Sequence, residues 1–146
     1  MNYSRLRETL IRHEGKRLCP YRDSVGKLTI GVGRNLDDRG ITDAEAELLL
    51  TQDLLRCEDE LRKHLSFFDQ LNSPRQEVLT NMCFNLGLEG LMGFRNMLSS
   101  LQRAVAGGGQ AIFIEAADHM LDSKWAKQVG TRAVELARVM RDGKWI

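Results

Sequence analysis

The segment HEGKRLCPYRDSVGKLTIGVG, residues 13–33, decides which kind of fold this chain forms. Gly15 follows a helical pattern and is a typical helix terminator, so a helix is expected to end at Glu14. Two short runs of strand-forming residues come next, with the turn sequence Asp23-Ser24-Val25-Gly26 between them. The second run, Leu28–Val32, alternates apolar residues with polar or small ones. The segment therefore predicts a helix followed directly by a β-hairpin.

Helix signals dominate the rest of the sequence. Thr42-Asp43-Ala44-Glu45 and Ser73-Pro74-Arg75-Gln76 both fit the capping box, in which side chains at the helix start bond the first free N–H groups. An apolar stripe behind Thr42 predicts a long amphipathic helix over 42–65, and one behind Ser73 predicts a helix that ends at Gly87. The two stripes are Leu50, Leu54, Cys57, Leu61 and Leu65, and Val78, Leu79, Met82, Cys83 and Leu86. Shorter helices are expected at 96–106, 111–121 and 131–141.

Together these elements predict one α+β domain over residues 1–146, mostly helical and large enough to bury a core. A small β-hairpin lobe at about 15–41 would be joined by the long helix over 42–65 to a helical lobe at 66–146. The helix over 4–14 is expected to pack near a cleft between the lobes.

The composition is that of a globular protein and argues against several classes. Hydrophobic residues make up 42% and charged residues 28% of the chain, and no stretch has the apolar length of a membrane span. A net charge of +1 argues against a nucleic-acid binder, which usually carries a broad basic excess. Cys19, Cys57 and Cys83 are odd in number and lack metal-ligand spacing. We therefore expect reduced core cysteines, with neither a disulfide framework nor a metal site.

Charge is unevenly distributed along the chain. Residues 5–34 hold eight bases and three acids, residues 37–60 hold two bases and nine acids, and residues 124–144 hold six bases and two acids. Basic segments of this kind either bring a cationic surface to an anionic polymer or form ordinary solvated faces.

Glu14 breaks the apolar pattern of the first helix. Leu6 and Leu10 lie four residues apart on one helix face, and the next position of that face is Glu14. Burial of a carboxyl group there would raise its pKa, as a general acid near neutral pH requires. The alternative is a glutamate at a helix end that turns to solvent or pairs with an arginine.

Two further candidates lie in the hairpin. Alternation places the apolar residues of the second run on one face and Thr29 on the other, with Gly31 beside it. A glycine there leaves room for a ligand to approach the Thr29 hydroxyl. Asp23, at the opposite end of the hairpin, is expected on the same open side. The alternative is that Asp23 only forms the turn and Thr29 only favours the strand.

A helix that ends in an acid, followed by a hairpin with an acid and a hydroxyl, resembles the catalytic segment of the phage-type, T4-like lysozymes. Glu14 and Asp23 are nine positions apart and Asp23 and Thr29 are six apart, which is the family's spacing. Further matches in the family's order extend the resemblance over nearly the whole chain. The matching motifs are His13-Glu14-Gly15, Tyr21-Arg22-Asp23, Leu28-Thr29-Ile30-Gly31-Val32-Gly33, Asn81-Met82-Cys83-Phe84-Asn85-Leu86-Gly87 with Gly93-Phe94, Ser123-Lys124-Trp125, Thr131-Arg132-Ala133 and Gly143-Lys144-Trp145.

The resemblance implies a lysozyme-like fold and an endolysin without a cofactor. Such an enzyme hydrolyses the β-1,4 bond between N-acetylmuramic acid and N-acetylglucosamine in bacterial peptidoglycan. Glu14 would protonate the glycosidic oxygen, while Asp23 and Thr29 hold the attacking water on the opposite face of the sugar, so that the anomeric configuration inverts. Arg132 would pair with Glu14. Substrate-binding or supporting positions are implied for Arg132, Phe84, Asn85, Gly31, Trp125 and Arg34.

The expected partner is peptidoglycan, bound by a monomer, and no nucleic acid is expected. Met1–Leu10 lacks the apolar core of a signal peptide, so synthesis in the cytoplasm of a host cell is expected. The chain would then reach the cell wall through a separate holin-like membrane protein and contribute to host cell lysis.

Two departures from the family's best-known member concern the small lobe. Residues 35–41 connect the hairpin directly to the long helix, where that member has a longer stretch with a small helix, so the substrate lobe is trimmed on one side and the family's sugar subsites are not carried over. Arg34 replaces a histidine that pairs with the acid matching Asp53. Either the arginine keeps that pair with its longer reach, or its side chain is solvated.

Two other functions stay open at the level of sequence. A lytic transglycosylase cleaves the same bond without water, and Asp23 and Thr29 would then have no water to hold. A non-catalytic peptidoglycan-binding module would share the fold without turnover. The complete set of Glu14, Asp23 and Thr29 favours the hydrolase.

Overall fold

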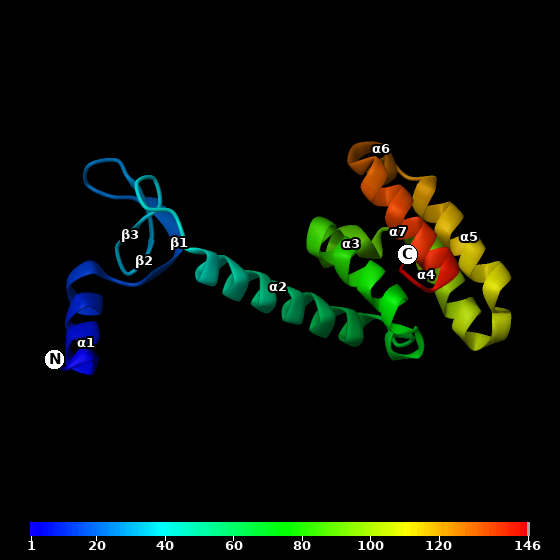
Figure 1. The fold of residues 1–146 in the computed structure, drawn as a ribbon, viewed down its shortest axis with the longest axis horizontal. Helices are drawn as coiled ribbons and strands as arrows, with labels where there is room; N and C mark the ends of the chain where they lie inside the picture. Colours follow the sequence, from blue (N-terminus) through cyan, green and yellow to red (C-terminus); the bar gives the residue numbers. More distant parts are fainter. Residues whose placement is uncertain (146) are drawn as a thin grey trace. The chain divides into compact units, whose positions relative to one another are not determined.

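The computed structural model describes residues 1–145 of the chain, which forms two compact units, Met1–Leu49 and Leu50–Ile146. Helices predominate, and one small antiparallel sheet lies in the N-terminal part of the sequence, as predicted for a mostly helical α+β fold (Figure 1). Within residues 1–145 no helix has both the length and the apolar character that crossing a bilayer requires.

Unit 1, Met1–Leu49, begins with a capped helix. Helix α1, Tyr3–Glu14, starts after Asn2, whose side chain accepts the Arg5 N–H at 3.0 Å. It ends at Gly15, whose φ of 79° turns the chain out of the helix. The predicted helix end at Glu14 is therefore confirmed.

The sheet of unit 1 has the strand order β1-β2-β3, formed by β1 (Arg17–Arg22), β2 (Leu28–Gly31) and β3 (Arg34–Asn35). β1 and β2 are the predicted hairpin, and β3 adds a short third strand antiparallel to β2. The pairing of β1 with β2 is irregular between Arg17 and Tyr21. Pro20 lies in this stretch and has no N–H to donate, which an edge strand such as β1 tolerates.

Helix α2, Asp43–His64, is the long helix predicted behind the first capping box. The Glu45 N–H donates to Thr42 Oγ1 at 3.2 Å, and the Thr42 N–H donates to Glu45 Oε2 at 2.9 Å. This box is confirmed, because each side chain satisfies a backbone N–H that the helix leaves free. The apolar stripe of the helix is buried from Cys57 onward, together with Leu61 and Leu65.

Unit 2, Leu50–Ile146, is a group of helices around one core. Its elements after α2 are η1 (Phe68–Gln70), α3 (Ser73–Met92), α4 (Arg95–Arg103), the π-helical turn η2 (Ala104–Gly108), α5 (Gln110–Leu121), α6 (Lys124–Val129) and α7 (Thr131–Asp142). Helix α5 packs against α4 and α7, and α7 also packs against α3 and α6 (Figure 1). Leu, Met and Val side chains from several helices fill the core. The fully buried ones include Leu61, Leu79, Met82, Leu101, Met120, Val139 and Met140.

The capping box predicted at Ser73 is wrong, because α3 begins one residue earlier. Asn72 is the N-cap, and its side chain accepts the Arg75 N–H at 3.3 Å. The Gln76 amide donates to the Phe68 carbonyl at 3.0 Å instead of returning to the helix start. Asn and Ser are about equally good N-caps, so the local sequence does not decide between two neighbours.

The helix predicted to end at Gly87 breaks at that residue, and a second helical stretch follows within α3. Gly87 has φ 74° and ψ 165°, and the chain is helical again up to Met92. A glycine indicates a break in the helix but not the course of the chain after it. Helix α6 was not predicted, because six residues are too few to show an apolar stripe.

The cysteines differ in their surroundings. Cys57 and Cys83 are buried in the core of unit 2, as expected, whereas Cys19 on the edge strand β1 is exposed, so the prediction of a core position is wrong for it. Burial raises the pKa of the Cys83 thiol to about 12. This thiol is therefore protonated and unreactive at neutral pH.

Candidate active site

Glu14 is the last residue of α1, and its side chain is exposed. No residue of α1 is buried, so the buried face predicted from Leu6 and Leu10 is not found in unit 1. Within residues 1–49 Thr29 is the only buried side chain. Within unit 1 the position of Glu14 therefore follows from the end of α1 and not from a buried apolar face.

The Glu14 carboxylate lies against the backbone of Gly33, in the turn between β2 and β3. A methyl group on Gly33 would lie 3.1 Å from Glu14 Oε2 and 3.3 Å from Glu14 Cδ. Gly33 also has a φ of 69°, which residues with a side chain rarely adopt. Because this residue is a glycine, the turn that directly follows the Thr29 strand comes into contact with the acid.

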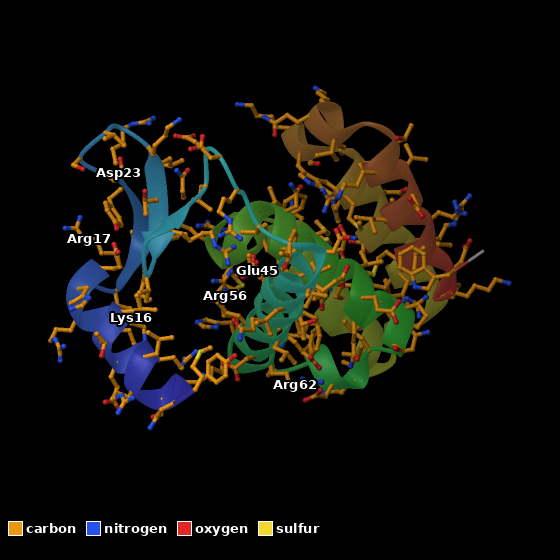
Figure 2. The ribbon with its side chains drawn as sticks, turned by 60° about the vertical axis from the view of Figure 1, so that its left-hand side comes forward. Lys16, Arg17, Asp23, Glu45, Arg56 and Arg62 are labelled. Carbon is orange, nitrogen blue, oxygen red and sulfur yellow. The ribbon has the colours of Figure 1, made fainter. Side chains whose placement is uncertain are left out.

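Asp23 opens the turn between β1 and β2 (Figure 2). Its Oδ1 accepts the Val25 N–H at 3.0 Å and the Lys27 N–H at 2.8 Å. Among residues 1–145 no side-chain or backbone donor bonds its Oδ2. Asp23 thus forms the turn with one carboxylate oxygen, and the second oxygen is left for a ligand.

Thr29 lies on the central strand, opposite Tyr21 on β1 and Asn35 on β3. It is only 3% exposed, so the prediction that its side chain lies on an open face is wrong. Its hydroxyl donates to the Lys27 carbonyl at 2.9 Å. Two residues along the strand, a methyl group on Gly31 would meet no atom within 4 Å. The room that the glycine was expected to leave is present there.

The backbone of Lys27 connects Asp23 with Thr29. Its N–H binds Asp23 Oδ1, and its carbonyl accepts both the Thr29 hydroxyl and the Asp23 N–H, the latter at 2.9 Å. One peptide segment therefore orients both residues that the family resemblance assigns to the attacking water. No sequence signal could have identified Lys27, since every residue offers such a backbone.

Arg34 is paired with Glu45. Two bonds of 2.7 Å join Arg34 Nη1 and Nη2 to the Glu45 carboxylate, and Nη1 also donates to the Gly40 carbonyl at 3.3 Å. Asp53 pairs within its own helix at 3.2 Å. The Arg34 side chain is therefore not simply solvated, whereas a pair with Asp53 would join residues of different units and stays a prediction. The short connection over 35–41 brings Arg34 to the first turn of α2, where Glu45 lies.

The ion pair with Arg34 lowers the pKa of Glu45. Hydrogen bonds from the Arg34 guanidinium and from the Thr42 N–H lower the pKa of Glu45 to about 2. The Glu45 carboxylate is therefore ionised at neutral and at mildly acidic pH.

The implied residues of unit 2 join motifs that are far apart in the sequence. The Arg132 guanidinium on α7 donates to Asn81 Oδ1 on α3, at 2.7 and 3.1 Å. Trp125 Nε1 on α6 donates to Asn85 Oδ1 on α3, at 2.8 Å. Phe84, next to Asn85, is 46% exposed.

Sequence reasoning missed two polar partners, Glu45 and Asn81. Glu45 was recognised only as part of a capping box, and Asn81 only as part of a matching motif. The Arg132 pair with Glu14 would join residues of different units and stays a prediction.

The comparison with known proteins covers nearly the whole chain. The sequence profile of the phage lysozyme family matches residues 11–140. The pre-baseplate central spike protein Gp5 of Enterobacteria phage T4 is 26% identical over 93% of this chain, which spans only 27% of that protein's length. The probable T4-type lysozyme 1 of Dictyostelium discoideum is 24% identical over 96% of this chain and 95% of its own length. Because the profile covers most of the sequence, including Glu14, Asp23 and Thr29, the chain belongs to the phage lysozyme family.

Proposed function

We propose that this protein is an endolysin that hydrolyses the β-1,4 bond between N-acetylmuramic acid and N-acetylglucosamine in bacterial peptidoglycan. Membership of the phage lysozyme family supports a lysozyme-type activity on peptidoglycan. The contact of the Glu14 carboxylate with Gly33 carries the assignment of the site. It places an acid beside the sheet on which Asp23 and Thr29 share a backbone segment.

Glu14 is the proposed general acid. A carboxyl group is the residue type that protonates a glycosidic oxygen while the bond breaks. The Gly33 turn lies close to one side of this exposed carboxyl group, and the rest of the group is open to a substrate.

Asp23 and Thr29 are the proposed anchors of the attacking water. The Thr29 proton is committed to the Lys27 carbonyl, so toward a water the hydroxyl can only accept. Asp23 Oδ2 is also an acceptor. A water that donates both its protons to these two oxygens keeps a lone pair for the anomeric carbon. A water held in this way would attack directly, in a single displacement with inversion.

The fragments released from peptidoglycan distinguish the candidate activities. Purified protein is incubated with peptidoglycan, and the soluble products are analysed by mass spectrometry. We expect hydrated reducing ends. Anhydro ends would indicate a transglycosylase, and the absence of fragments would indicate a binding module.

Glu14→Gln tests the acid. The amide keeps the shape of the side chain but has no proton to give to the leaving oxygen, so activity should fall about 10² to 10⁴-fold, the usual contribution of general acid catalysis. Glu8→Gln, the same change on the same helix, is the control and should be as active as the wild type. Activity of Glu14→Gln close to that of this control would refute the assignment.

The anomer that forms first tests whether Asp23 and Thr29 direct an attacking water. NMR of a freshly cleaved β-linked oligosaccharide should show the α-anomer before mutarotation mixes the two forms. Initial formation of the β-anomer, or a covalent adduct trapped on Asp23, would make Asp23 a nucleophile instead.

A further inference from the structure

We infer that the ion pair of Arg34 with Glu45 positions Glu14, because it holds the β2–β3 turn, and with it Gly33, against the Glu14 carboxyl group. The inference rests on the proposed role of Glu14 as the acid. Arg34 and Glu45 are thus positioning residues, which act through the backbone of Gly33.

A continuous series of contacts connects the pair to the acid. A methyl group on Gly33 would lie 3.1 Å from Glu14 Oε2, so the acid and the turn are close neighbours with no room for a side chain between them. Arg34 is the next residue, and both of its terminal nitrogens bind the Glu45 carboxylate at 2.7 Å. Glu45 is held in turn by the Thr42 N–H at 2.9 Å, at the first turn of α2. The start of a long helix therefore anchors the turn.

The short ladder between β2 and β3 closes the turn, and the ion pair adds a side-chain anchor to it. Both Gly31 and Gly33 have a φ of 69°, and glycine at such positions leaves the backbone many alternative conformations. The strand that follows, β3, is only two residues long. A bidentate arginine–carboxylate pair defines orientation as well as distance, so it restricts a flexible turn more than a single bond does.

Both members of the pair stay charged from mildly acidic to neutral pH. The pKa of Glu45 is about 2, mainly because of the Arg34 hydrogen bonds, so the carboxylate does not lose its charge in mild acid. The pair is also partly exposed, with side-chain exposures of 34% and 37%. Solvent screens such a pair, so its removal should leave the protein folded.

Three variants and a control test the inference by kinetics with soluble glycan oligosaccharides. Arg34→Ala removes both bonds, Arg34→Lys keeps the charge but cannot form the parallel bonds, and Glu45→Gln keeps an acceptor for the Thr42 N–H. Misplacement of a catalytic group by about 1 Å can cost about 100-fold. We expect kcat to fall by about 10- to 100-fold in Arg34→Ala and Glu45→Gln with KM unchanged, and less in Arg34→Lys. Arg62→Ala, which removes an ion pair with Glu58 and Asp69 in unit 2, should leave both constants unchanged.

An NMR measurement tests the positioning without any turnover. A nuclear Overhauser effect between the Gly33 Hα and Glu14 Hγ protons is expected in the wild type and in Arg62→Ala, and its loss is expected in Arg34→Ala. Retention of this effect and of kcat in Arg34→Ala would overturn the inference, as would a rise in KM alone, which would place Arg34 in substrate binding. An inactive wild-type protein would refute the proposed function, while the Overhauser comparison would still decide the positioning.

Discussion

Asp23 uses its two carboxylate oxygens differently. Oδ1 accepts two backbone N–H groups and closes the β1–β2 turn, while Oδ2 is free of bonds from residues 1–145. The turn-forming role and the proposed water-holding role thus fall on separate atoms of one side chain. Substitutions that preserve only one of these atoms can therefore separate the two roles.

The variants Asp23→Asn and Asp23→Ala separate the role of Asp23 in the turn from its proposed role in activity. Asparagine keeps an oxygen for the Val25 and Lys27 N–H groups, so the free energy of unfolding should match the wild type while activity falls by about 10² to 10⁴-fold. Alanine also loses the turn bonds and should cost about 1 kcal/mol of stability in addition. Urea unfolding and a peptidoglycan lysis assay measure the two effects. An active Asp23→Asn protein would mean that Asp23 is only a turn residue.

At the scale of elements, the start of α2 joins the helix to the sheet of unit 1. Glu45 binds the Thr42 N–H of its own helix and the guanidinium of Arg34 on β3. One carboxylate therefore accepts a free N–H group at the start of α2 and also binds a side chain of β3. Its protonation should weaken both connections at once.

The free energy of unfolding should therefore fall in acid as Glu45 becomes protonated. The Glu45 pKa is lowered from 4.5 to about 2 in the folded state, so between these values the unfolded chain binds more protons than the folded one. The contribution of the pair is fully present above pH 4.5 and is lost as the pH falls to about 2. Urea unfolding over this range should show a shallower pH dependence for Glu45→Gln than for the wild type. Glu47→Gln, on the same helix, is the control, and equal slopes in all three proteins would contradict the assignment.

At the scale of the whole molecule, Arg75 is the buried charge that ties the helices of unit 2 together. It lies on α3 and is only 9% exposed. Its guanidinium donates to the Met140 and Arg141 carbonyls at the end of α7, at 2.7 and 2.9 Å. It also lies 3.5 Å from the centre of the Phe113 ring on α5. Burial lowers the pKa of this guanidinium, but arginine stays charged.

Loss of Arg75 should therefore destabilise the protein without affecting the chemistry. Arg75→Ala leaves two carbonyls without their charged donor, and we expect a loss of about 2 to 3 kcal/mol in the free energy of unfolding. Arg75→Lys should recover only part of it, because an ammonium group cannot form both bonds and stack on the ring. Arg138→Ala on the exposed side of α7 is the control for urea unfolding. A stability of Arg75→Ala equal to that of Arg138→Ala would show that this contact contributes nothing.

The sequence predicted which residues form the candidate site better than it predicted their burial. The family spacing brought Glu14, Asp23 and Thr29 into one hypothesis, but the alternation of apolar residues placed Thr29 wrongly. Thr29 was expected to be open and is 3% exposed, while for Glu14, which is exposed, the pattern left burial and exposure as alternatives. Periodicity indicates which side chains share a face, whereas their burial depends on how much of the fold covers that face.

By itself the sequence determined the local features of this protein. The helix end at Gly15, the turn at Asp23 and the capping box at Thr42 each depend on residues within about four positions, whose backbone and side-chain preferences suffice.

Only the tertiary structure decided the partners of the long polar side chains. A guanidinium or an indole N–H donates to whichever acceptor the fold brings within reach, and nothing in its own neighbourhood specifies that acceptor. The acceptors of Arg34, Trp125 and Arg132 are Glu45, Asn85 and Asn81, which lie 11, 40 and 51 positions away in the sequence.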